Sequence, residues 1–232
     1  MCGRYTLVQT GGLASRFDTQ NELKELRPNY NASPGQAMPV VTRNSPNILQ
    51  IMQWGLVPSW AKDPKIGYKM INARAETVAE KPSFRSALKR RRCLVPATGF
   101  YEWKRQGNLK QPMYIRVEDQ EIVALAGLYE HWQDPEGNEL MSYTIITTTP
   151  NSLMESIHDR MPVILPREAE DQWLDSSLDD PLKLLPLLIP YSAKQMAAHP
   201  VSVEVNSPRN NAPSLLLPVE EQSPIQGEAN SK

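Results

Sequence analysis

The sequence predicts an α+β fold: a single domain built on a curved, mainly antiparallel β-sheet or open barrel with flanking short helices. Three observations support this prediction. Short runs rich in β-branched and aromatic residues alternate with turns marked by glycine and by many of the 21 prolines. Most connections between these runs are short, which favours antiparallel pairing. Helical patterns are few and do not alternate strictly with the strands, which argues against a parallel α/β architecture.

The individual elements follow from residue type and spacing. Eight strands are expected, over residues 4–8, 39–43, 49–54, 93–96, 100–104, 113–117, 122–128 and 143–148. Three helices are expected, over residues 82–91, 150–157 and 167–174. The first begins with Pro82, and proline is accepted in the first turn of a helix. Residues 1–218 are expected to form the domain, and residues 219–232, rich in polar residues, a disordered tail.

Composition and cysteine content narrow the class of protein. The chain has 232 residues, of which 40% are hydrophobic and 22% charged, as in soluble globular proteins. No apolar run approaches the roughly 18 residues that a membrane span needs, and the start MCGRYTLVQT does not resemble a signal peptide. A cytoplasmic protein is expected. With two cysteines, three scattered histidines and no Cys-x-x-Cys pair, neither a disulfide framework, a metal site nor another cofactor is expected.

The charges are distributed unevenly along the chain. Residues 1–116 contain 19 basic and 7 acidic side chains, whereas residues 117–232 contain 6 basic and 19 acidic ones. This asymmetry predicts a basic surface for a polyanion if the fold keeps the two halves on separate faces. The alternative is that the halves interleave and neutralise each other.

Cys2 carries the first chemical hypothesis. Aminopeptidases remove an initiator methionine when the second residue is small, and Cys2 would then bear an α-amine and a thiol on adjacent carbons. Their ordinary pKa values are about 8 and about 8.5, so both reactive forms are accessible near neutral pH. An aldehyde would form a Schiff base with the amine, and addition of the thiol would close a thiazolidine ring. The alternative is that Cys2 is a small apolar residue packed beneath the first strand.

Glu102, in the segment GFYEWK, is a candidate acid/base. Strand alternation sends its side chain to the face opposite Tyr101 and Trp103. If that face lines a cleft, loss of solvent raises the pKa of the carboxyl toward the useful range. In the other interpretation Glu102 is an exposed glutamate above buried aromatic residues.

Two further segments offer groups of complementary chemistry. His158, in IHDRMP, lies beside an aspartate and an arginine and would titrate near neutral pH. Asn72, in MINARAET, is a neutral donor and acceptor suited to a sugar hydroxyl or an aldehyde oxygen, and Arg74 is a candidate phosphate contact. All three could equally be ordinary loop or turn residues.

Basic and aromatic side chains suited to a single-stranded nucleic acid surround these motifs. The basic ones are Arg4, Arg85, Lys89, Arg90, Arg91 and Arg92, and the aromatic ones are Trp54, Trp60, Tyr68 and Trp103. A run such as KRRR at residues 89–92 is also typical of a solvated helix end.

The motifs together resemble one known family. MCGRY, YNASPG, QWGLVPSWAKD, INARAET, CLVPATGFYEWK, AGLYEHW, TIITTTPN, IHDRMPVIL and HPVSVEVN occur in the order and spacing of the SRAP (SOS response-associated peptidase) family, whose members are also called abasic-site processing proteins. The resemblance runs from residue 2 to about residue 211. It departs from many members at NASP, and Ala61 stands where some relatives carry a second tryptophan.

The resemblance implies a covalent activity. Family members attach their N-terminal cysteine to a ring-opened abasic site in single-stranded DNA through a thiazolidine, with weak lyase activity and autocatalytic removal of the residue ahead of the cysteine. On this basis the catalytic residues are Cys2, Asn72, Glu102 and His158. Arg4, Arg74 and Arg160 resemble phosphate contacts, and Pro34, Trp60 and Pro162 would shape the groove. Arg85 and Trp103 complete the expected DNA-binding set.

Two other functions share these residues. The chain could be a cysteine peptidase that cleaves peptides in trans with Cys2, Glu102 and His158, or a non-catalytic single-strand binding module. The expected partner is single-stranded DNA with an abasic site, and the replication machinery is a candidate protein partner. A monomer that associates with the nucleoid through DNA, without membrane contact, is expected.

Overall fold

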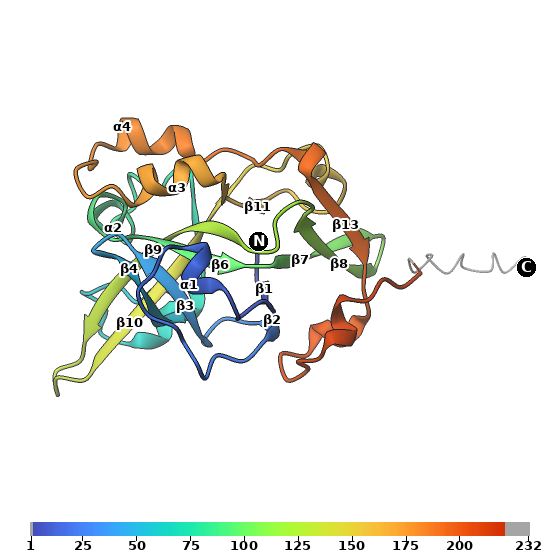
Figure 1. The fold of residues 1–232 in the computed structure, drawn as a ribbon, viewed down its shortest axis with the longest axis horizontal. Coiled ribbons are helices and arrows are strands. Elements are labelled where there is room, and N and C mark those ends of the chain that lie inside the picture. The colour runs from blue at the N-terminus through green and yellow to red at the C-terminus, as the bar shows by residue number, and fades with distance from the viewer. Residues whose placement is uncertain (1, 221–232) are drawn as a thin grey trace, which may run out of the picture.

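The computed structural model describes residues 2–220, and their core is a closed five-stranded β-barrel (Figure 1). Its strands are β3 (Ala37–Thr42), β4 (Ser45–Trp54), β6 (Arg92–Ala97), β9 (Val123–Gln133) and β10 (Glu139–Thr148). Antiparallel pairs join β4 to β3, β3 to β6, β6 to β9 and β9 to β10. A parallel pair between β10 and β4 closes the circuit. The prediction of an α+β fold on a mainly antiparallel barrel is therefore confirmed, with the barrel closed rather than open.

Short strands extend this barrel at its edges. They are β5 (Asn72–Arg74), β11 (Met161–Pro162) and β12 (Ile164–Leu165). Both β5 and β11 pair with the C-terminal half of β10, in parallel and antiparallel orientation respectively. β12 pairs with β9. The end of β10 therefore brings together two segments that are distant in sequence.

A second sheet of five strands lies beside the barrel (Figure 1). Its order is β13 (Met196–Pro200), β8 (Leu109–Val117), β7 (Gly99–Gln106), β1 (Arg4–Leu7) and β2 (Asn29–Ala32). Every pair in it is antiparallel. Each of the eight expected strands coincides with an observed one, whereas the short strands β2, β5, β11, β12 and β13 were not expected.

Helices are short and peripheral. The α-helices are α1 (Leu13–Arg16), α2 (Arg85–Arg90), α3 (Arg167–Leu174) and α4 (Pro181–Leu184). The 3-10 turns are η1 (Pro64–Lys69), η2 (Met154–Ser156), η3 (Leu185–Leu187), η4 (Ala193–Gln195), η5 (Val203–Asn206) and η6 (Pro213–Leu216). α3 matches its prediction, and α2 begins three residues later than expected. The helix expected over residues 150–157 is reduced to η2, because the Asn151 side chain accepts from the Met154 N–H (3.0 Å) and closes a tight turn.

The basic run at residues 89–92 is partly structural. Arg92 is fully buried, and its guanidinium donates to carbonyls at the ends of α2 and α3, including Leu88 O (2.9 Å) and Asp175 O (2.7 Å). Arg91 pairs with Glu130 at 2.8 Å. Arg92 thus satisfies the otherwise unpaired carbonyls of two helix ends, and the expectation that it contacts a nucleic acid is wrong.

Other sequence expectations concern the termini and bound groups. Val219 donates its N–H to Pro200 O at 3.0 Å, and residues 221–232 of the predicted tail lie outside the described residues. Within residues 2–220 no helix has the length and apolar character needed to cross a bilayer. The same residues contain no group of three or more His, Cys, Asp or Glu side chains placed to hold a metal ion. Cys2 and Cys93 are both free thiols.

Candidate active site

A cleft of about 430 Å³ lies where the β7–β8 hairpin meets the loop before β11. It is lined by Glu102, Trp103, Arg105, Lys110, His158 and Asn206. Two of the four predicted catalytic residues are therefore neighbours in space although 56 positions apart in the chain. The pairing of β7 with β1 then brings the N-terminal segment to the same place, because Arg4 lies opposite Tyr101 in the ladder.

Cys2 lies two residues before the start of β1 and is fully buried. Its thiol donates a long hydrogen bond to Arg4 O, at 3.8 Å. Burial raises the pKa of this thiol well above its ordinary value, and the negative charge of Glu102 raises it further. The thiolate is therefore scarce at neutral pH, and a reaction of this sulfur requires a neighbouring group that accepts its proton.

Glu102 supplies such a group. Its side chain is 2% exposed, and burial raises the pKa of the carboxyl to about 7. The sequence left open whether this residue faces a cleft or solvent, and the structure places it on the inner side. A carboxyl with a pKa near 7 is present in both protonation states at neutral pH and both gives and takes protons.

His158 faces Glu102 across the cleft. Its Nε2 lies 3.8 Å from Glu102 Oε2. On the other side of the ring, Nδ1 accepts the Arg160 N–H (3.1 Å). The same Nδ1 lies 2.9 Å from Asp159 Oδ1. Burial lowers the pKa of His158, which favours the neutral ring.

Asn72 comes from the barrel, on β5. Its Nδ2 donates to Ile145 O at 3.4 Å, and β5 runs beside β10 at this point. The buried Oδ1 accepts no hydrogen bond. A buried acceptor without a donor costs free energy unless a ligand supplies one, so Asn72 is equipped to receive a hydroxyl.

The predicted phosphate contact Arg4 is engaged by the protein itself. Its Nη1 donates to Asn31 Oδ1 (2.7 Å) and Val205 O (2.8 Å), and its Nη2 to Asn206 O (3.2 Å). These bonds fasten residues 201–218, which we call the C-terminal strap, to β1 and β2. The strap in turn places Asn206 in the cleft, where Asn206 Oδ1 accepts from Trp103 Nε1 at 2.8 Å.

Arg74 and Arg160 meet at the end of β10. Arg74 is exposed and lies beside Thr147 in the β5–β10 ladder. Arg160 donates to Thr147 O (2.6 Å) and forms a two-bond ion pair with Glu76 (2.6 and 3.0 Å). The hydrogen bond from Arg160 lowers the pKa of Glu76, so this pair persists at neutral pH. Pro162 is buried within β11.

The remaining predicted contacts are distributed over the surface. Trp60 is 59% exposed on the loop between β4 and η1. Pro34 is half-buried in the turn after β2, and Trp103 lines the cleft. Arg85 begins α2, which packs on β6 and β9, away from the β7–β8 hairpin (Figure 1). The structure therefore groups Trp103 with the catalytic candidates and does not group Arg85 with them.

Sequence reasoning missed four residues: Arg105, Lys110 and Asn206, which line the cleft, and Asn31, which holds the C-terminal strap. Asn31 and Asn206 stand in YNASPG and HPVSVEVN, which were quoted for the resemblance without a role. The turn signal QGNL at residues 106–109 marks the hairpin that sets Arg105 opposite Lys110. Strand pairing was the missing information in each case.

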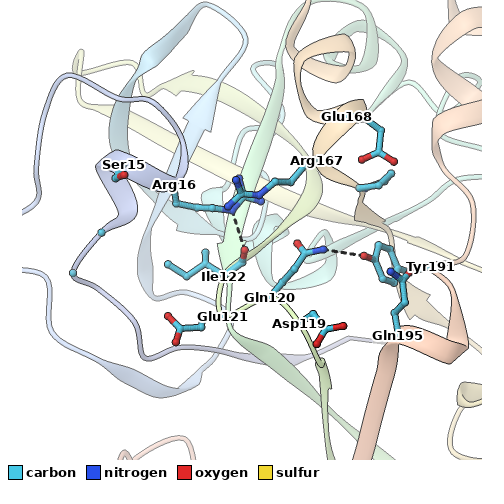
Figure 2. Close-up of a pocket in the computed structure, with 13 residues that line it drawn as sticks. Ser15, Arg16, Asp119, Gln120, Glu121, Ile122, Arg167, Glu168, Tyr191 and Gln195 are labelled. Carbon is cyan, nitrogen blue, oxygen red and sulfur yellow. Dashed lines mark hydrogen bonds between the residues drawn. The ribbon is translucent and has the colours of Figure 1, made fainter.

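A second, larger hollow of about 760 Å³ lies between α1, the β8–β9 turn and the start of α3 (Figure 2). Arg16 donates to Ile122 O (2.9 Å) there, and Gln120 donates to the Tyr191 hydroxyl (3.0 Å) (Figure 2). Arg16 also forms a buried ion pair with Glu170. None of the predicted site residues lines this hollow, and Arg16 joins α1 to α3 through Glu170.

Comparison with known proteins identifies the class of this chain. A family model described as SOS response associated peptidase (SRAP) matches residues 1–208. The chain belongs to the SRAP family. The resemblance inferred from the motifs is confirmed.

Two named relatives and one solved structure agree with the assignment to the SRAP family. Abasic site processing protein YoqW of Bacillus subtilis (strain 168) is 52% identical, over 93% of this chain and 99% of the relative. Abasic site processing protein HMCES of Xenopus tropicalis is 37% identical, over 83% of this chain and 67% of the relative. A crystal structure of a protein from Bacteroides thetaiotaomicron superimposes with a TM-score of 0.87 at 33% identity, covering 94% of this chain and 100% of that one.

Proposed function

We propose that this chain processes abasic sites in single-stranded DNA by forming a covalent thiazolidine through Cys2, once removal of Met1 has freed the α-amine. The observation that carries the proposal is the meeting of Glu102 and His158 at one cleft, with the buried Cys2 close enough for Glu102 to raise the pKa of its thiol. The names of the relatives supply the substrate class, an abasic site.

The first step is imine formation. The α-amine of Cys2 adds to the C1′ aldehyde of the ring-opened sugar, and the resulting carbinolamine loses water. Glu102 in its protonated form gives a proton to the departing hydroxyl, which requires an acid available at neutral pH. His158 shares this proton relay across 3.8 Å. Asn72 would hold the freed sugar hydroxyl through its unpaired Oδ1.

The second step closes the ring. The Cys2 sulfur adds to the imine carbon, and its proton passes through the Glu102 carboxylate to the nitrogen. Because burial keeps the thiol protonated, this proton transfer is necessary before or during the addition. Elimination from the imine before the ring closes would give weak lyase activity, and the finished adduct would shield the site from strand cleavage.

Intact-mass spectrometry tests this proposal. The purified chain is expected to lack Met1 and, after mixing with an abasic oligonucleotide, to gain the mass of the oligonucleotide minus one water. Cys2→Ser retains the amine but has a weaker nucleophile, so we expect an imine that borohydride traps and no stable adduct without it. An unchanged stable adduct with Cys2→Ser would overturn the role of the thiol. Turnover of peptides in place of DNA capture would favour a peptidase.

The same proposed activity implies where the protein acts and which residues hold the DNA. A chain that captures single-stranded DNA would associate with the nucleoid in the cytoplasm through that DNA. The predicted contacts Arg4, Arg74, Arg85 and Arg160, with Pro34, Trp60, Trp103 and Pro162, remain the candidates for holding the strand.

A further inference from the structure

The β7–β8 hairpin carries two like charges side by side. Arg105 lies directly opposite Lys110 in the antiparallel ladder. Both side chains are exposed, and neither forms a hydrogen bond or an ion pair with an acidic residue among those the structure describes. Like charges directly opposite each other in a sheet are destabilising. Such a pair therefore indicates that the two cations bind an anionic ligand.

The position of this pair indicates what that ligand is. Arg105 and Lys110 line the same cleft as Glu102 and His158. Trp103 lies two residues before Arg105, so both side chains project from the face of β7 opposite Glu102, and all three residues line the cleft. The Trp103 ring is held by the hydrogen bond to Asn206. Cations next to a fixed aromatic ring are the combination that binds single strands, with phosphates on the cations and a base on the ring.

We propose that Arg105 and Lys110 bind neighbouring phosphates of the DNA strand that flanks the abasic nucleotide. The inference rests on the proposed function, because it takes the cleft to be the place of reaction. It adds a strand path: from the reactive Cys2 and Glu102, past Trp103, to the tip of the β7–β8 hairpin.

Salt-dependent binding measures these contacts directly. Reversible binding of a 20-nucleotide single strand would be followed by fluorescence anisotropy in a Cys2→Ala background, with and without Arg105→Gln and Lys110→Gln. Each phosphate contact contributes about 0.7 to the slope of log affinity against log salt concentration, so the double variant should lower that slope by roughly 1.4. Affinity in 0.1 M salt should fall on the order of tenfold. An unchanged slope would overturn the proposal.

A matched control removes two positive charges elsewhere. Lys24 and Lys183 are both exposed, and Lys183 lies on α4, at the opposite end of the molecule from the β7–β8 hairpin (Figure 1). The variant Lys24→Gln/Lys183→Gln has the same net charge as the test variant. We expect it to retain the parental slope. An equal loss in both variants would reveal an effect of net charge alone and would contradict specific contacts.

A third variant separates ligand binding from stability. Lys110→Glu replaces the like-charged pair with an opposite-charged one, so the melting temperature should rise while DNA affinity falls. A purely structural role of the pair would not produce opposite changes in the two quantities, and a fall in both would contradict the proposal.

Kinetics of covalent capture distinguish this inference from the proposed function. With Cys2 present, the Arg105→Gln/Lys110→Gln variant should need more DNA for half-maximal rate while its rate at saturating DNA is unchanged. If the parent forms no adduct with abasic DNA, the proposed function fails. The slopes of log affinity against log salt concentration still test the two phosphate contacts. If the parent forms the adduct and the slopes do not differ, only this inference fails.

Discussion

A carboxyl group that is close to half ionised at neutral pH is the main chemical consequence of burying Glu102. An exposed glutamate would be almost fully ionised there and would be a poor proton donor. Burial beside the Cys2 thiol produces the opposite situation, with a pKa of about 7. The same residue can then release a hydroxyl in one step and take up a thiol proton in the next.

Glu102→Gln preserves the shape of the side chain and removes its titration. We expect the single-turnover rate of adduct formation to fall by about 10²–10⁴-fold, the usual contribution of a general acid/base. The gap between parent and variant should be largest near pH 7 and narrower at lower and higher pH, because the protonated carboxyl is needed to release the hydroxyl and the carboxylate to accept the thiol proton. Glu136→Gln, an exposed change of the same charge, is the control. A parental rate in Glu102→Gln would exclude the assigned role.

The free energy of unfolding should depend on pH through the same titration of Glu102. The pKa of Glu102 is raised from 4.5 to about 7 on folding, so the folded state holds its proton more tightly than the unfolded state. The stabilisation is complete below pH 4.5 and is lost as the pH rises through about 7. Relative to Glu102→Gln, the free energy of unfolding of the parent should therefore decrease by roughly 3 kcal/mol across that window. Urea unfolding at several pH values measures it.

At the scale of elements, the C-terminal strap depends on one buried side chain. Asn31 Nδ2 donates to Val205 O (3.2 Å), Ser207 O (3.0 Å) and Asn210 O (2.9 Å). Asn31 Oδ1 accepts from Arg4. A single amide thus links β2, β1 and the strap, and through the strap it positions Asn206 at the cleft.

Asn31→Ala should detach the strap without unfolding the barrel. We expect a loss of about 2–4 kcal/mol, since three carbonyls and the Arg4 guanidinium lose a buried partner. Hydrogen exchange should accelerate within residues 201–218 and stay unchanged in β9 and β10. Asn211→Ala provides the comparison, because Asn211 is exposed and its side chain makes two hydrogen bonds, accepting the Tyr30 N–H (2.7 Å) and donating to Pro28 O (3.4 Å). Equal effects of the two substitutions would argue against a central role for Asn31.

Strands and residue types could be predicted from the sequence, but the contacts between them could not. Alternation indicated β7 and placed Glu102 on one face, yet whether that face was buried depended on β1 and the loop before β11. Arg4 was expected to contact phosphate, whereas its partners Val205 and Asn206 lie some 200 positions away. Arg92 looked like part of a basic surface because its helix-end acceptors near Asp175 belong to a distant segment. Local patterns contain no information on such pairings.

At the scale of the whole molecule, closure of the barrel requires a close approach of β9 to its neighbours. A Cβ added at Gly127 would lie 2.8 Å from Cys93 Sγ and 3.0 Å from Thr144 O. The glycine thus allows β6, β9 and β10 to come together around one point of the core.

Gly127→Ala should therefore strain the closed barrel. Overpacking of this kind costs about 1–3 kcal/mol, and both flanking strands would have to shift. Thermal or urea unfolding measures the loss. Gly11→Ala is the control, since nothing lies within 4 Å of a Cβ at that position. Similar stabilities of the two variants would show that the barrel tolerates a wider spacing.

The closing strand β10 also sets an order of events during protein synthesis. β3, β4 and β6 leave the ribosome well before β10, so they present unpaired edges until about residue 148 has emerged. At 5–20 residues per second, that interval lasts on the order of ten seconds. Cys2 emerges from the ribosome before β3, and His158 emerges only after β10. A nascent chain therefore exposes Cys2, the proposed nucleophile, long before Glu102 and His158 can be placed beside it, and the proposed site is assembled only after the barrel has closed.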